Sequence, residues 1–386
     1  MKLIPVHRLC FCAALVAAVG FLAMTPPVRS QVASRTTEAA GCRPSFPYKE
    51  GWLGADAAYS IPLAPGQSLW LFGDSLVGKP SARDRKAANF VRNSIAVSTC
   101  NRANGWQINY YWKNKNRSKP TAFFDTKEEE YWYWPLDGFL YRGRLYVAIS
   151  KLKNKPNEEV FSFETVGVYL AVVTNLSTTP DQWQAEYLRL SEGSALYPGS
   201  TIVLDGEFAN LFTVEETTPP EKRSHMILSR LSLAKLDRGE VSFEYFAQDK
   251  SWKPGIRGTD SAVVIETGHS EMSVRYHAEA KQWVAVSGGD FLSNQIMIRT
   301  APALTGPWSE QRAVYEFPEM SKNNPRRDRD TWCYAVKEHI EFAEANRMLV
   351  TYACNSFKLE KLFTNTDIYR PQTVLVQLPS SKRVNS

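Results

Sequence analysis

Short strand patterns that end in turn residues recur along this sequence, and Gly51–Thr99 shows the pattern first. The runs Tyr59–Leu63, Leu69–Phe72 and Ser94–Ser98 are apolar or alternate between apolar and polar residues. Such runs between turn residues are typical of β-strands. An acid, Asp56, stands just before the first of them. This layout constrains the fold because four later segments repeat it.

The later copies begin near Trp132, Tyr197, Gly268 and Lys337. Each copy has up to four short strands in roughly 60–80 residues, which is the pattern of a β-propeller with long loops. A helical period is visible only around Ser232–Asp237. The sequence therefore predicts an all-β, five-bladed β-propeller, and the alternatives are a pair of β-sandwiches or two barrels.

The fifth copy has a hairpin but no clear fourth strand. The hairpin pairs Ala335–Phe342 with Arg347–Tyr352, and a third strand follows at Thr373–Leu378. We expect the segment Phe46–Trp52 to supply the fourth strand and close the ring.

The first 30 residues have the layout of a bacterial export signal. Basic Lys2, His7 and Arg8 precede Leu9–Met24, an apolar run of 16 residues that is short for a membrane span. We predict a signal peptide over residues 1–30 and a secreted or periplasmic protein, with an uncleaved anchor as the alternative. The remaining chain divides into a lead-in at 31–50, the propeller at 51–378 and a C-terminal tail at 379–386.

The charge of the chain argues against a nucleic-acid partner. The formal net charge is +6, and the signal segment holds three basic residues and no acid, so about +3 remains on the mature part, without a basic patch. No second apolar run is long enough for a membrane span. We therefore expect a monomer that does not bind a membrane once the signal is removed.

Four cysteines lie outside the signal segment, an even number that suggests disulfides in an exported protein. Cys333 and Cys354 flank the hairpin of the fifth copy and should lie almost opposite each other, within disulfide reach. Cys42 and Cys100 then pair by elimination. No C-x-x-C spacing is present, so a zinc site is not expected.

Polar residues occupy the same register in the first hairpin of most copies. Asp137, Ser200 and His339 each stand eight residues before the second strand of their hairpin, and Asp56 and Glu271 take the corresponding place in copies with longer loops. The innermost strand of each propeller blade lines the central channel. We therefore expect these five side chains to converge around one axial pocket.

Carboxylates that face each other across a pocket suit glycosidic cleavage. One must be protonated to donate to the leaving oxygen, and another must be ionised to activate water or attack carbon. Like charges held close together separate the pKa values and hence the two roles. Asp56 and Glu271 are the main candidates, whereas Asp137 in Asp-Gly and a lone His339 also suit a turn and a core residue.

Other residues near these acids are candidates for binding substrate. Asp74 ends a strand as a turn residue or a supporting carboxylate, and Arg92 and Asn93 can reach the pocket mouth or serve their loop. The aromatic run Trp132–Trp134 precedes Asp137 and can either stack on sugar rings or pack between blades. Trp134 and Tyr276 complete the substrate-binding candidates, together with Ser200 and His339.

Four motifs carry a resemblance to a known group of proteins. They are WLGADAAYSIPL with LWLFGDS and VRNSIAVST, WPLDGFLYRGRLYV, EMSVRYHAEAKQWVAVSGGD, and DIYRPQTVLVQL. Over residues 51–378 the chain resembles the secreted five-bladed propeller glycoside hydrolases of the bacterial endo-D-arabinanase type. It is more distantly similar to five-bladed arabinanases and xylosidases, which place one acid at the head of each of three blades.

The resemblance implies Asp56 as base or nucleophile, Asp137 as pKa modulator or orienter, and Glu271 as general acid. Ser200 departs from the pattern because it offers no acid in the third blade. His339 is similar to a channel histidine that helps some relatives hold a metal ion such as calcium; no other cofactor is expected.

These features predict a secreted glycoside hydrolase that cleaves a furanose-containing, arabinan-like polysaccharide or oligosaccharide by carboxylate acid–base catalysis. One alternative is a lectin-like propeller, which needs the aromatic residues but no acid pair. The other is a polysaccharide lyase, for which Tyr276 with Arg275 would supply a base and a cation.

Overall fold

The computed structural model describes residues 42–378, except 102, 116, 118, 157–161, 217–223 and 291. The predicted signal peptide and the C-terminal tail lie outside the described residues. Within them no helix is both long and apolar enough to span a membrane.

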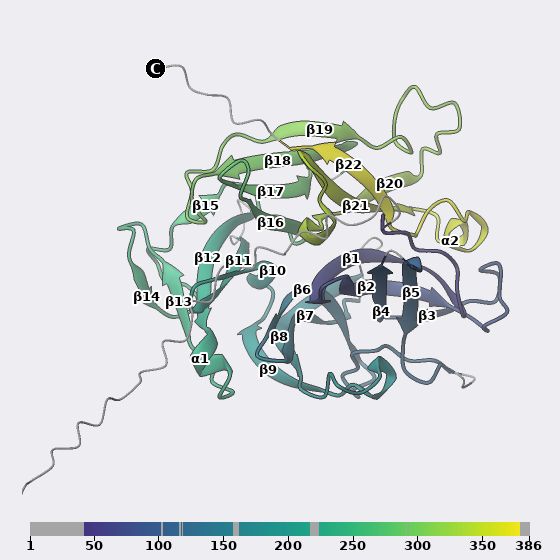
Figure 1. Cartoon of the computed structure of the whole chain (residues 1–386), viewed down its shortest axis with the longest axis horizontal. Helices are drawn as coiled ribbons and strands as arrows, with labels where there is room; N and C mark the ends of the chain where they lie inside the picture. Colours follow the sequence, from purple (N-terminus) through teal and green to yellow (C-terminus); the bar gives the residue numbers. More distant parts are fainter. Residues whose placement is uncertain are drawn as a thin grey trace, which may run out of the picture.

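Five antiparallel sheets form a ring around a central axis, which confirms the predicted five-bladed β-propeller (Figure 1). Blade one contains β1 (Trp52–Ala64), β2 (Gln67–Val77), β4 (Ser94–Asn101) and β5 (Gly105–Tyr111), with β3 (Asn89–Val91) beside β2. Blade two contains β6 (Tyr131–Tyr141), β7 (Arg144–Asn154), β8 (Phe163–Val173) and β9 (Ala185–Glu192).

The other three blades follow in chain order. Blade three contains β10 (Leu196–Asp205), β11 (Phe208–Glu216), β12 (Ser224–Ser232), β13 (Phe243–Phe246) and β14 (Trp252–Pro254), with β15 (Val263–Ile265) beside β12. Blade four contains β16 (Met272–His277), β17 (Gln282–Gly288), β18 (Gln295–Ala301) and β19 (Arg312–Glu316). Blade five contains β20 (Thr331–Glu338), β21 (Arg347–Ser356) and β22 (Gln372–Gln377). The first strand of each blade contacts the first strand of the next one, so these five strands surround the axis.

Blade five is closed differently from the prediction. In the described part of the chain β22 pairs only with β21, and Phe46–Trp52 adds no strand to it. Phe46 instead packs edge-on against Trp70 of blade one, with ring centroids 4.9 Å apart. Pro44 and Pro47 flank Phe46 and lack the backbone donors that a ladder needs. The hairpin also differs, because β20 ends at Glu338 and a 3₁₀ turn covers Ile340–Phe342.

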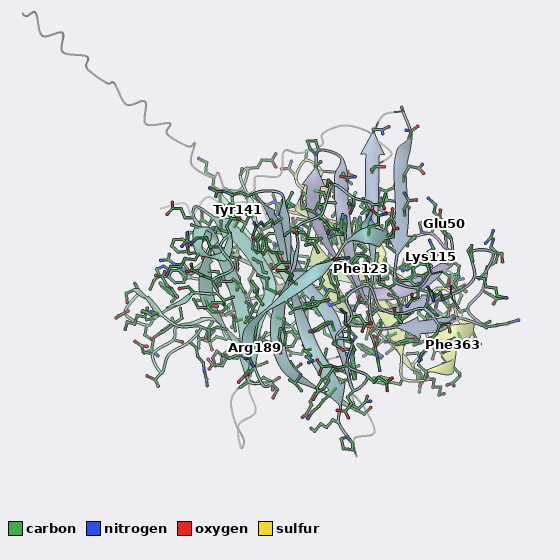
Figure 2. The ribbon with its side chains drawn as sticks, turned by 90° about the horizontal axis from the view of Figure 1, so that it is seen from below. Glu50, Lys115, Phe123, Tyr141, Arg189 and Phe363 are labelled. Atoms are coloured by element: carbon green, nitrogen blue, oxygen red, sulfur yellow. A yellow bond between two sulfur atoms is a disulfide. The ribbon has the colours of Figure 1, made fainter. Side chains whose placement is uncertain are left out.

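Both predicted disulfides are present. Cys333 and Cys354 are direct partners in the β20–β21 ladder. Cys42 joins Cys100 at the end of β4 and ties the lead-in to blade one. Figure 2 shows Glu50 and Lys115 side by side, and their 3.1 Å ion pair adds a second link between the lead-in and this blade.

Helical segments are few and short. The helical pattern near Ser232–Asp237 corresponds to α1 (Leu233–Leu236), where the Ser232 hydroxyl caps the first turn. A second helix, α2 (Glu360–Thr364), follows β21, and a 3₁₀ turn at Pro180–Gln182 precedes β9. These segments lie outside the blades' ladders and do not line the axis.

Candidate functional site

The innermost strands are irregular at the positions that carry the candidate site residues. The ladder registers shift around Asp56 in β1, at Asp137 in β6 and at Ser200 in β10. In β1 the bulge holds Ala57 and Ala58 at φ of 62° and 83°, a backbone region that is unfavourable for alanine. Bulges re-aim side chains, and strained backbone persists where the surrounding structure holds it. The bulges thus turn residues of the inner strands towards the axis.

Blade five also has a bulge in its innermost strand. The sequence did not predict the two side chains that this bulge directs towards the carboxylates. The register of β20 shifts between Tyr334 and Lys337, and Ala335 has a φ of 58°. Tyr334 and Lys337 lie on either side of this bulge and both reach the carboxylates of other blades. The available signal was a lysine that directly follows the mostly apolar run Trp332–Val336, and the hairpin register did not select it.

Asp56 is partly buried and tightly held. Its Oδ2 accepts a 2.6 Å hydrogen bond from the Tyr334 hydroxyl. Burial raises the pKa of Asp56 well above its usual range, and the negative charges of Asp74 and Glu271 raise it further. A Cβ on Gly73 would stand 2.4 Å from the Asp56 Oδ1, so the neighbouring strand needs a glycine there. Asp56 therefore retains a proton at higher pH than an exposed aspartate.

Asp74 interacts electrostatically with Asp56 and is held by Trp134 and Arg92. The Trp134 indole Nε1 donates to its Oδ1 at 2.9 Å, and the Arg92 Nη1 lies 3.5 Å from its Oδ2. Burial raises the pKa of Asp74 to about 6, although the nearby Arg92 opposes this shift. The guanidinium of Arg92 also lies over the Trp132 ring, 4.1 Å from its centroid. The Arg92 guanidinium and the Trp134 indole thus contact Asp74, and Arg92 in turn covers the Trp132 indole.

Glu271 precedes β16 and is paired with a buried cation. The Lys337 Nζ lies 3.4 Å from the Glu271 Oε1, with side-chain exposures of 2% and 30% respectively. The same ammonium lies 4.1 Å from the centroid of the Tyr59 ring. Burial lowers the pKa of Lys337, and the charge of Glu271 opposes that shift. Glu271 is therefore held by the buried ammonium of Lys337, while part of its side chain remains open to solvent.

Asp137 is a fully engaged carboxylate that joins blades two, three and four. Its oxygens accept four hydrogen bonds of 2.8–3.1 Å, from the Gly138 and Ile202 backbone N–H groups, the Thr201 hydroxyl and the Arg275 guanidinium. Such a set of donors stabilises a carboxylate and fixes its orientation. This geometry suits an orienting residue better than one that exchanges protons.

His339 lies in the wall of the channel and both of its ring nitrogens have partners. Its Nδ1 is 2.7 Å from the Ser60 hydroxyl and its Nε2 is 2.7 Å from the Thr351 hydroxyl. Burial lowers the pKa of His339 well below its usual range, which keeps the ring neutral. A metal ligated by this ring would have to displace one of the hydroxyls. Among the described residues, the one close group of ligand atoms is Glu319 with Cys333 and Cys354, whose sulfurs form a disulfide.

Two other candidates, Asn93 and Ser200, form no hydrogen bond with the carboxylates among the described residues. Asn93 is buried and bonds to the backbone of Phe124 and Tyr133, so it holds the connection between blades one and two. Ser200 is fully buried in its bulge, and its hydroxyl has no partner among the described residues.

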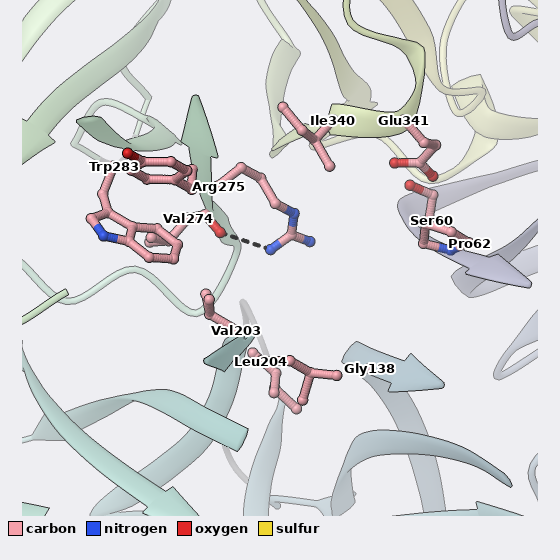
Figure 3. Close-up of a pocket in the computed structure, with 12 residues that line it drawn as sticks. Ser60, Pro62, Gly138, Val203, Leu204, Val274, Arg275, Trp283, Ile340 and Glu341 are labelled. Atoms are coloured by element: carbon pink, nitrogen blue, oxygen red, sulfur yellow. Dashed lines mark hydrogen bonds between the residues drawn. The ribbon is translucent and has the colours of Figure 1, made fainter. Parts of the chain in front are cut away.

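Tyr276 lines a separate cavity further along the channel. Its walls are formed by inner-strand residues such as Ser60, Val274, Arg275 and Tyr276, together with Trp283 of β17 and Glu341 of the 3₁₀ turn after β20. Figure 3 shows the Arg275 guanidinium pointing into this cavity, towards the wall that holds Ser60 and Glu341. Arg275 also bonds to Asp137 at 3.1 Å, so this residue links the wall of the cavity to the Asp137 carboxylate.

Comparisons with known proteins found one family model and several solved structures of similar fold. A family described as Domain of unknown function (DUF5005) matches residues 45–378. No curated protein matches the sequence.

Among solved structures, a Bacteroides ovatus ATCC 8483 protein that is provisionally described as a hydrolase superposes with a TM-score of 0.67. It is 18% identical, and the match covers 85% of this chain and 87% of that one. A xylan β-1,4-xylosidase from Bacillus halodurans C-125 has a TM-score of 0.49 at 10% identity, covering 86% of this chain and 54% of the xylosidase. At these identities the likeness is one of fold.

Proposed function

Because this chain belongs to the DUF5005 family, whose description names no function, we propose its activity from the site: it is an exported glycoside hydrolase. The observation that carries the proposal is the group of carboxylates on the inner strands. Asp56 in blade one and Glu271 before blade four interact electrostatically although they belong to blades that are not neighbours in the ring. Both keep part of their surface open. Paired carboxylates of this kind are the machinery of glycosidic cleavage.

In the proposed mechanism Asp56 activates water and Glu271 protonates the leaving oxygen. Tyr334 holds Asp56, Lys337 holds Glu271, and Asp137 orients the inner strands around them. A base whose pKa lies nearer neutrality accepts a proton more readily, which suits the raised pKa of Asp56. We expect inversion of the anomeric centre, because the two acids come from blades on different sides of the axis and leave room for water.

A second assignment of roles is favoured by the electrostatic interaction between Asp56 and Asp74. The charge of Asp74 is the largest electrostatic contribution to the raised pKa of Asp56. Two carboxyls that share a site in this way separate into a protonated and an ionised member. In this assignment Asp56 donates the proton, and Asp74 or Glu271 acts as the ionised partner.

The proposed substrate is a furanose-containing, arabinan-like polysaccharide. The partly exposed Trp134 ring and the Arg92 guanidinium, which covers the buried Trp132 ring, offer flat surfaces on which a sugar ring can stack. The Bacteroides ovatus protein of the same fold is described as a hydrolase, which is consistent with this class of reaction. Two disulfides suit an oxidising compartment outside the cytoplasm and support export.

The first experiment is a screen of the purified protein against arabinan, arabinogalactan and xylan, with sizing of the products. Asp56→Asn and Glu271→Gln should each lower turnover by about 10²–10⁴ with little change in folding. Both variants cleaving at the wild-type rate would refute the carboxylate mechanism. Binding of a polysaccharide without any product would favour the lectin-like alternative.

Substrates with different leaving groups separate the two assignments. An aryl glycoside with an acidic phenol needs no protonation of the leaving oxygen, so it restores turnover only to the variant that lacks the proton donor. Small anions such as azide should restore turnover only to the variant that lacks the base. Rescue of Glu271→Gln by the aryl glycoside supports our first assignment, and rescue of Asp56→Asn supports the second.

A further inference from the structure

Lys337 is a buried ammonium at the site, and in the proposed reaction its one stated role is to hold Glu271. It is 1% exposed and directly follows the bulge of β20. Lysine is almost never fully buried unless it is paired. Its pairing with Glu271 at 3.4 Å is supplemented by the Tyr59 ring at 4.1 Å. The environment of Lys337 is more specific than that of a surface ion pair, because Glu271 and Tyr59 belong to two other blades.

The charges around Lys337 come from each inner strand that packs near it. They are Glu271 before β16, Asp56 on β1, Asp137 on β6, and the neutral ring of His339. Three carboxylates around one axis repel each other, and burial makes that repulsion larger. A single ammonium near all three lowers this cost. Asp137 has Arg275 as a cation of its own, so Asp56 and Glu271 depend most on Lys337.

We propose that Lys337 is a positioning residue of this site: its ammonium holds the Glu271 carboxyl group and supplies the charge that allows Asp56 to ionise beside it. This inference rests on the proposed function for its kinetic consequence but not for its electrostatic one. Lys337 acts through the two acids and itself transfers no proton to substrate. The ammonium charge of Lys337 lowers the pKa of Asp56, against the effects of burial and of the other acids.

The test compares Lys337→Met with Lys337→Arg. Loss of the ammonium should raise the pKa of Asp56, so the acidic limb of the kcat/KM profile should move to higher pH by about one unit. On that limb, a shift of one unit is about a tenfold loss of activity. Lys337→Arg keeps the charge and should restore the position of the limb, even if turnover stays low. A merely structural role would lower activity equally at every pH.

Lys113→Met is the matched control. Lys113 also packs over an aromatic ring, 4.5 Å from the centroid of Phe123, and its ammonium donates to the carbonyl groups of Asp181 and Trp183. The same substitution there removes a partly buried ammonium without touching the carboxylates. It should leave the pH profile unchanged, and a shift equal to that of Lys337→Met would overturn the proposal.

A second measurement needs no substrate, and its titration of Lys337 uses the wild-type protein. The carboxyl carbon of Asp56 is followed by NMR in protein labelled with ¹³C-aspartate, and its resonance is identified by its absence in Asp56→Asn. The Lys337 ammonium is titrated in parallel in ¹⁵N-lysine-labelled wild-type protein. We expect Lys337 to stay charged throughout the ionisation of Asp56, and to find the Asp56 midpoint raised in Lys337→Met.

The outcomes separate the two proposals. A neutral Lys337 in the pH range where Asp56 ionises overturns the inference even if the variants fail to fold. An unchanged Asp56 midpoint in folded Lys337→Met also overturns it. Absence of cleavage on all polysaccharides, together with a shifted Asp56 midpoint, refutes the proposed hydrolase and leaves the role of Lys337 supported.

Discussion

At the scale of single residues, the charge of Asp74 should control the protonation of Asp56. Burial raises the pKa of Asp74 to about 6, and its charge raises the pKa of Asp56. In Asp74→Asn the Trp134 donor can keep an oxygen acceptor, but the charge is lost. The pKa of Asp56 should then fall, and the acidic limb of kcat/KM should move to lower pH by about one unit. This is the opposite direction from that expected for Lys337→Met.

The same substitution has a measurable effect on stability. Because the folded-state pKa of Asp74 lies above its usual value, the folded protein binds this proton more tightly than the unfolded chain does. That stabilisation is present at low pH and is lost as the pH rises through about 6, with a full size of about 3 kcal/mol. The free energy of unfolding of Asp74→Asn, relative to wild type, should therefore increase from acidic to neutral pH in urea titrations. A difference that is independent of pH would contradict this.

At the scale of elements, the β1 bulge depends on a glycine in the neighbouring strand. In Gly73→Ala the new Cβ would stand 2.4 Å from the Asp56 Oδ1, so the carboxylate must move. A displacement of about 1 Å at a reacting group can cost roughly 10²-fold in rate. We expect a loss of that size in kcat, measured on the polysaccharide found in the screen, while thermal unfolding shows a folded protein.

Gly288→Ala in β17 is the control for this prediction. Its new Cβ would meet only the Val336 Cγ2 at 3.8 Å, an ordinary contact. The variant should therefore keep its activity. Equal losses in both variants would show that alanine in these strands acts through the sheet and not through the Asp56 carboxylate.

At the scale of the whole molecule, one carboxylate joins three blades around the axis. Asp137 of blade two bonds to blade three through Thr201 and Ile202, and to blade four through Arg275. Asp137→Asn leaves the largely buried guanidinium without its counterion, a loss that typically costs about 3–5 kcal/mol. We expect urea unfolding to show a free energy of unfolding that is lower by about that amount, together with a lower midpoint. Glu240→Gln, which removes the exposed Arg238–Glu240 pair, should change stability by less than about 1 kcal/mol.

The sequence by itself determined the repeating part of this fold. Strand period, turn residues and the number of copies are local signals, and they were enough to predict five antiparallel blades in an all-β propeller. The Cys333–Cys354 disulfide could be predicted for the same reason, because the number of residues from the turn shows which residues of a hairpin lie opposite each other. The register of the first hairpins also selected Asp56, Asp137 and Glu271 as positions facing the axis, and their catalytic roles stay predictions.

Only the tertiary structure decided which groups meet at the axis. Tyr334 contacts Asp56 across 278 positions of the chain, and Lys337 contacts Glu271 across 66. These contacts depend on bulges that break the strand period and on the closure of the ring, so neither spacing nor composition encodes them directly. The edge of blade five was mispredicted because Phe46 gained more by packing on Trp70 than a proline-flanked segment could gain in a ladder. Local pattern determines the elements, whereas the packing of distant blades determines the electrostatic environment in which a carboxylate can react.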